Sequence, residues 1–94
     1  MAREFSRSRR VGEQIQRELA ELIQREVKDP RVGMVTVSAV DVSRDLAHAR
    51  VFVSRFDDSE KIEETLEALR HAGGFLRREL GRRMKMRMVP ELRF

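Results

Sequence analysis

Apolar residues in the first third of the chain recur three or four positions apart, which is the spacing of one face of a helix. This stripe consists of Val11, Ile15, Leu19, Leu22, Ile23 and Val27. We therefore predict a helix over residues 9–27. The helix should end at Asp29-Pro30, because the residue before a proline avoids the helical conformation, and Gly33 then frees the backbone to turn.

Two alternating stretches follow, and they predict an antiparallel hairpin. The first, residues 35–43, reads VTVSAVDVS, and its first two valines share one parity whereas its last two share the other. Either both faces of this strand are partly covered, or a bulge lies near residues 38–39. The second stretch, residues 47–56, alternates without interruption after a polar turn.

The next helical stretch, residues 62–80, has an apolar face that is interrupted at Ala72-Gly73-Gly74. A glycine inside a helix costs roughly 1 kcal/mol relative to alanine, so two adjacent glycines predict two helices that meet at a kink. We expect Gly74 to be the position where the backbone turns, or where the helices approach too closely for a side chain. A third strand is predicted over residues 86–94, with its proline at the strand start, at a bulge or at a sheet edge.

The order of these elements is helix, strand, strand, helix, kink, helix, strand. It predicts an α+β fold with helices packed on one face of a three-stranded sheet. The chain of 94 residues suits a single domain, residues 1–94, with a basic arm at residues 1–8. No apolar run approaches the roughly 20 residues of a membrane span, and none follows the basic N-terminus, so we expect neither a membrane anchor nor a secretory signal.

Charge is distributed unevenly along the chain. The formal net charge is +4, yet residues 57–67 are almost entirely acidic where they are charged, whereas residues 1–10 and 77–87 are strongly basic. Such a basic face favours an anionic partner, and nucleic acid fits better than a membrane because there is no basic amphipathic helix with large aromatic anchors. The alternative is a solvated charged face that has no partner.

The basic stretch 77–87 contains more arginine than lysine, and the planar guanidinium fork of arginine suits phosphate. The main candidate RNA contacts are Arg77, Arg78, Arg82, Arg83, Lys85 and Arg87, and the second-rank candidates are Arg9, Arg10, Lys28, Arg31 and Arg44. The chain has no Trp or Tyr. This argues against a protein that stacks the bases of a single strand, and it favours recognition of RNA by backbone and shape.

The sequence has no constellation of residues for catalysis or cofactor binding. It contains neither a GxGxxG motif nor a phosphate-binding GxxxxGKS/T motif, and it has no cysteine. His48 and His71 have no metal-ligand neighbour three or four positions away. Met84, Met86 and Met88 alternate toward the third strand, which packing explains better than a soft-metal site. We therefore expect no enzyme activity, metal or cofactor.

The element order, with small residues between the second and third helices, resembles a type II KH domain. In that fold a GxxG loop joins the two helices, whereas this chain has Ala72-Gly73-Gly74. Such an Ala-x-Gly kink resembles the bacterial ribosome-binding factor A family, in which Ala72 and Gly74 would set the kink. Three stretches carry the resemblance over essentially the whole chain: EFSRSRRVGEQIQREL, REVKDPRVGMVTVSAVDVSRDLAHARVFVS and MRMVPELRF.

The resemblance implies a cytoplasmic monomer that binds the free 30S small ribosomal subunit during late maturation, without a nucleotide cofactor. It implies a part in 5′-end processing of 16S ribosomal RNA and in growth in the cold, and an assembly GTPase that helps the factor to leave. Two other functions remain open from the residues alone. One is a KH-like module that binds single-stranded RNA away from the ribosome, and the other is a protein-interaction module whose basic face meets an acidic partner.

Overall fold

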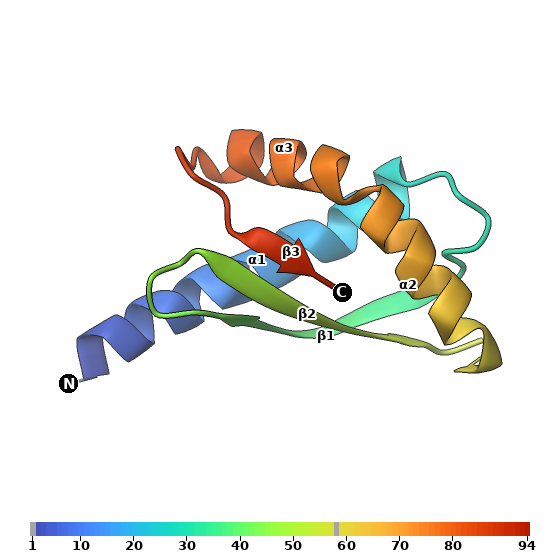
Figure 1. The fold of residues 1–94 in the computed structure, drawn as a ribbon, viewed down its shortest axis with the longest axis horizontal. Helices are drawn as coiled ribbons and strands as arrows, with labels where there is room; N and C mark the ends of the chain where they lie inside the picture. Colours follow the sequence, from blue (N-terminus) through green and yellow to red (C-terminus); the bar gives the residue numbers. More distant parts are fainter. Residues whose placement is uncertain (1, 58) are drawn as a thin grey trace.

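A three-stranded sheet carries three helices on one side, and the longest helix spans most of the length of the molecule (Figure 1). The computed structural model describes residues 2–57 and 59–94. Its elements are α1 (Ala2–Glu26), β1 (Val35–Val42), β2 (His48–Arg55), the short 3-10 helix η1 (Ser59–Lys61), α2 (Ile62–His71), α3 (Gly73–Met84) and β3 (Glu91–Arg93). The predicted α+β order is confirmed, as are the kinked helix pair and the three-stranded sheet.

The first helix begins earlier than its apolar stripe predicts. α1 starts at Ala2 rather than near residue 9, so the predicted helix start is wrong, and residues 2–8 of the expected basic arm are helical. Residues 2–8 contain neither glycine nor proline, so nothing in them stops the helix. They also carry no continuous apolar stripe, which is why periodicity places the start too late.

The hairpin of β1 and β2 contains the expected bulge. The antiparallel register shifts between Val37 and Ala39, so that two residues of β1 face one of β2. The shift returns the valines to the inner face, and Val37 and Val42 are both buried although their parity differs. The alternative of a strand that is covered on both faces is not needed.

The third strand is shorter than predicted. β3 contains only Glu91–Arg93 and pairs in parallel with β2, whereas the prediction was a strand over residues 86–94. Pro90 has no backbone N–H and lies just before the strand, where the Glu91 N–H donates to the Ala47 carbonyl at 2.8 Å. Parallel strands need a crossover connection, and α2 with α3 provides it.

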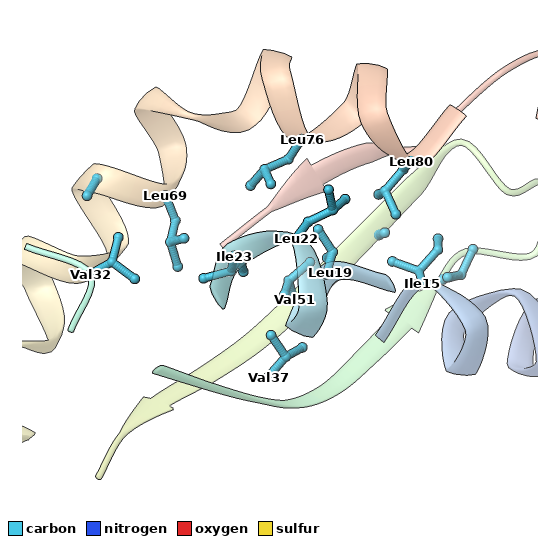
Figure 2. Packing of buried hydrophobic residues seen from close by; sticks show 13 residues of the cluster. Ile15, Leu19, Leu22, Ile23, Val32, Val37, Val51, Leu69, Leu76 and Leu80 are labelled. Atoms are coloured by element: carbon cyan, nitrogen blue, oxygen red, sulfur yellow. The ribbon is translucent and has the colours of Figure 1, made fainter. Parts of the chain in front are cut away.

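The core is built around the apolar stripe of α1 (Figure 2). Leu19 and Leu22 lie between the sheet, represented by Val37 and Val51, and Leu76 of α3. The completely buried leucine and isoleucine side chains of the described residues come from three helices and are Ile15, Leu19, Leu22, Leu69, Leu76 and Leu80. α1 therefore fixes the position of α3 relative to the sheet.

A polar cluster joins the loop after α1 to β2 and α2. Thr65 is fully buried, and its hydroxyl donates to the Arg31 carbonyl at 2.8 Å and accepts from Arg55 Nη1 at 3.3 Å. Arg55 also donates to the Arg31 carbonyl and pairs with Asp57 at 2.6 Å. Gly33 has a φ of +60° beside the Arg55 guanidinium, so the expectation that this glycine frees the backbone to turn is confirmed.

Close contact between α1 and β1 depends on a glycine whose role the sequence did not suggest. A Cβ at Gly12 would lie 2.7 Å from the Val40 carbonyl oxygen. One helical turn later, the Gln16 amide donates to the carbonyls of Val37 at 3.1 Å and Ser38 at 3.2 Å. α1 therefore covers the outer edge of β1 around the bulge, which protects an otherwise open strand edge.

We expect Gly12→Val to lower the free energy of unfolding by roughly 1–3 kcal/mol, because the new side chain would have to displace the β1 backbone. Urea denaturation, read as a change in midpoint at constant slope, measures this. Glu13→Val is the matched control, because it introduces the same residue at the exposed neighbouring position. Equal midpoints for the two variants would show that the contact between α1 and β1 tolerates a side chain.

Candidate nucleic-acid interface

The corner between α2 and α3 is made by one residue. Ala72 lies between the two helices with a φ of −84° and a ψ of 1°. Its N–H donates to the Ala68 carbonyl at 3.1 Å, and its own carbonyl accepts from the Leu76 N–H at 2.9 Å. The backbone therefore keeps its hydrogen bonds on both sides of the corner while the chain changes direction.

The two glycines that follow are not required by the fold. Neither Gly73 nor Gly74 has a positive φ, and a Cβ on either one would have no other heavy atom within 4 Å, apart from the neighbouring helix backbone. The expectation that Gly74 turns the backbone, or that it permits a close approach of the helices, is therefore wrong. Two helical glycines thus remain where alanine would fit and would favour the helix.

A basic groove lies beside this corner, between the first turns of α3 and the segment that leads into β3. It has a volume of about 380 Å³ and is lined by Gly74, Arg77, Arg78, Arg87, Met88 and Val89. Three of these six residues are arginines and none is acidic. Within the described chain, Arg78 and Arg87 are exposed and have no hydrogen bond or ion pair, so their guanidinium groups are available to phosphate.

The third arginine of this basic groove shapes its wall. Arg77 donates from Nε to the Pro90 carbonyl at 3.2 Å and from Nη2 to the Val89 carbonyl at 2.9 Å. These bonds hold the segment before β3 against α3, and they use carbonyl oxygens that have no strand partner. Arg77 is therefore partly committed to the fold, although sequence reasoning ranked it with the other arginines.

The remaining main candidates lie outside the basic groove. Arg83 donates to Glu18 at 3.1 Å and also to Glu21, both on α1, and these hydrogen bonds raise the pKa of Arg83. The same contact lowers the pKa of Glu21. Arg82 pairs with Glu79 at 3.3 Å. Lys85 ends α3 in a left-handed conformation with a φ of 54°.

The second-rank candidates are spread over other parts of the molecule. Arg9 and Arg44 line a separate hollow of about 520 Å³ between α1 and the end of β1, while Arg10 is exposed on α1 and Lys28 in the loop after it. Arg31 is engaged by its neighbours, because its guanidinium pairs with Asp29 at 2.8 Å and with Glu67 at 3.1 Å. The structure therefore groups Arg78 and Arg87 rather than all the basic residues.

Sequence reasoning missed the apolar part of the basic groove. Met88 was expected to pack inside, but 82% of its surface is exposed, beside the half-buried Val89. The alternation of the three methionines toward the third strand predicted that they pack inside the protein. In the structure they precede the strand, where alternation does not determine which side chains are buried.

In the described residues, no group of three His, Asp or Glu side chains gathers in a way that could hold a metal ion. In the same part of the chain, no helix is both long enough and apolar enough to cross a membrane.

Comparisons with known proteins agree on one family. The family model described as ribosome-binding factor A matches residues 7–94. A ribosome-binding factor A from Thioalkalivibrio sulfidiphilus is 63% identical over 94 residues, which cover 100% of this chain and 73% of the relative. One from Pseudomonas syringae pv. syringae is 56% identical over 96 residues, with 100% and 70% covered.

Solved structures give the same result. The crystal structure of ribosome-binding factor A from Thermus thermophilus is 38% identical, with a TM-score of 0.80 over 93% of this chain and 92% of that chain. A homology model of the Thermus thermophilus factor was fitted into a cryo-electron microscopy map of a complex with the 30S subunit. It is 40% identical, with a TM-score of 0.73 and coverage of 87% and 86%.

The pair of Asp29 and Arg31 predicts how stability responds to acid. The hydrogen bond from Arg31 lowers the pKa of Asp29 from 3.8 to about 2. A carboxyl with a depressed pKa stabilises the fold above its unfolded value and loses this contribution as pH falls through the folded value. Wild type should therefore be more stable than Asp29→Asn above about pH 4, and the difference should shrink toward pH 2. Thermal unfolding of both proteins across this range measures it, and a difference that does not vary with pH would contradict the assignment.

Proposed function

The chain belongs to the ribosome-binding factor A family, and on this premise we propose that it binds the 30S small ribosomal subunit through the basic groove at the corner of α2 and α3. Binding would place 16S ribosomal RNA against Arg78 and Arg87, and the protein would assist late maturation of the subunit, including processing of the 5′ end of that RNA. The fitted 30S complex of the Thermus thermophilus relative supports this choice of partner.

The observation that carries the proposal is the pair of glycines beside two unpaired arginines. Gly73 and Gly74 each weaken a helix by up to about 1 kcal/mol relative to alanine, and no contact within the protein requires them. A bound RNA backbone that approaches the corner closely would supply the missing reason, because a glycine leaves room for it. Arg78 and Arg87 then lie beside that backbone, in the place where phosphates would need cations.

The same basic groove bears on the alternative of a reader of single-stranded RNA. Its lining contains no aromatic side chain on which bases could stack. Exposed Met88 and half-buried Val89 offer an apolar surface that suits the face of a ribose or of one unpaired base. Because the lining has arginines for phosphate and no aromatic side chain, recognition of a folded RNA by its backbone and shape fits this groove better than the reading of a sequence.

The family resemblance adds two parts to the proposal. The protein would act without chemistry of its own, as a monomer that occupies the subunit during maturation. An assembly GTPase would then assist its departure. Both parts concern steps that follow binding to the subunit, so they depend on the contact at the basic groove.

Reversal of two charges tests the basic groove directly. We expect Arg78→Glu with Arg87→Glu to weaken co-sedimentation with 30S subunits strongly, and to reduce the magnitude of the log–log salt slope of binding by roughly 1.4 to 1.8. Arg82→Glu with Lys85→Glu is the matched control, because it changes the net charge equally outside the groove lining. If both double variants lose the same affinity, the effect is one of overall charge and not of this groove.

Alanine at the glycines separates the needs of the partner from those of the fold. Gly73→Ala and Gly74→Ala should each raise the denaturant midpoint, because alanine stabilises a helix by up to about 1 kcal/mol and has free space here. Gly74→Ala should nevertheless weaken subunit binding, because Gly74 is exposed and lines the basic groove, whereas Gly73 does not. Full binding by a stabilised Gly74→Ala protein would mean that RNA does not approach the corner.

A further inference from the structure

Two of the most exposed apolar side chains lie together at the end of the sheet where β1 begins and β2 ends. Met34 is 65% exposed and Phe56 is 90% exposed. The Phe56 N–H donates to the Met34 carbonyl at 3.3 Å, which fixes these residues opposite each other. They flank a hollow of about 440 Å³ whose other wall includes Ala20 and Gln24 of α1. We call this the apolar hollow.

The apolar hollow differs from the rest of the surface in its chemistry. Among the described residues that line it, none is charged, although 38% of the chain is Asp, Glu, Lys or Arg. Exposed apolar patches on otherwise polar proteins mark interaction sites. At the rim, Arg55 forms an ion pair with Asp57 at 2.6 Å, so the two opposite charges of this pair cancel beside Phe56.

The chain beyond Phe56 makes a nucleic-acid partner unfavourable. Glu60, Glu63 and Glu64 follow on η1 and α2 and are exposed. This acidic stretch repels phosphate, whereas the basic groove lies at the other junction of α2, where α3 begins. In Figure 1 the beginning of β1 lies at the right-hand end, and the segment that joins α3 to β3 lies toward the left. The two surfaces therefore suit partners of different chemistry.

A strand edge opens at the same place. In an antiparallel pair, hydrogen-bonded and non-hydrogen-bonded positions alternate. Because Met34 is bonded to Phe56, Val35 occupies a non-hydrogen-bonded position, and its N–H and C=O point away from β2 toward the outer edge. Gln16 donates hydrogen bonds to the carbonyls of Val37 and Ser38 along this edge, but it makes none to Val35.

We propose that the apolar hollow is a docking site for an extended segment of a protein of the small ribosomal subunit. The segment places one uncharged aliphatic or aromatic side chain in the hollow, against Met34 and Phe56, and its backbone pairs with Val35 as an added strand. The choice of partner follows from charge, because the lining of the hollow offers phosphate no cation and the nearby acidic stretch repels RNA, whereas an apolar side chain of a polypeptide fits an uncharged hollow. This inference rests on the proposed function for the identity of the particle, but it uses a different surface.

The test compares intact 30S subunits with protein-free 16S ribosomal RNA as ligands. Met34→Gln with Phe56→Gln should weaken binding to intact subunits on the order of 10-fold, as the loss of an apolar anchor does, and should leave binding to the free RNA unchanged. Phe52→Gln is the matched control, since Phe52 is 47% exposed on β2 but lies outside the apolar hollow. It should bind both ligands as the wild type does.

Each other outcome overturns the inference in a recognisable way. Unchanged binding of the double variant to intact subunits would show that the apolar hollow has no partner there. Weaker binding to the free RNA would assign the hollow to RNA instead. If the wild type did not bind subunits, this result would refute the proposed function, and the proposed ribosomal-protein partner would be refuted as well. A photo-crosslinking residue at position 56 should label a ribosomal protein, whereas a cross-link to a second copy of this chain would identify a dimer contact.

Discussion

The burial of one face of α1 is the contact on which the rest of the structure depends. Ile15, Leu19 and Leu22 are completely buried between the sheet and α3, so α1 sets the distance and direction of both layers. The basic groove is a consequence of this packing, because α3 forms one of its walls and lies where α1 holds it. The ion pairs of Arg83 with Glu18 and Glu21 fasten the same two helices at the surface. They are partly exposed, so they add less than the apolar contact beneath them.

Arginine has two different uses in this small protein, and only the folded structure separates them. Arg77 and Arg83 direct their donors to carbonyl oxygens and carboxylates of the protein itself. Arg78 and Arg87 come from the same basic stretch, but they line a groove that contains no acidic residue. A linear count of charges gives all of them equal weight. Among Arg77, Arg78 and Arg83 the distinction arises because α3 turns each successive side chain by about 100°. Arg87 lies beyond α3, in the segment that leads into β3.

The sequence predicted those features that depend on local chemistry. The change of valine phase located the bulge in β1, and two adjacent glycines located the corner between α2 and α3. Features that depend on contacts between distant residues were out of reach. The close approach of Gly12 to Val40, the exposure of Met88 and the shortness of β3 are all set by packing across the fold. The position of the corner was predicted correctly, but the physical reason given for it was wrong. Ala72 makes the turn, and a side chain would fit at either glycine.

Stability and binding therefore place different demands on the two ends of α2. At its beginning, the buried Thr65 exchanges hydrogen bonds with Arg31 and Arg55, and Gly33 has no room for a side chain. Just after its end, Gly73 and Gly74 have free space around them. They weaken α3, and no contact inside the protein compensates for this. Contacts within the protein therefore explain Gly33 but not Gly73 or Gly74, and the open space at the corner leaves room for a partner. This contrast supports the proposal that the corner of α2 and α3 is part of the binding surface.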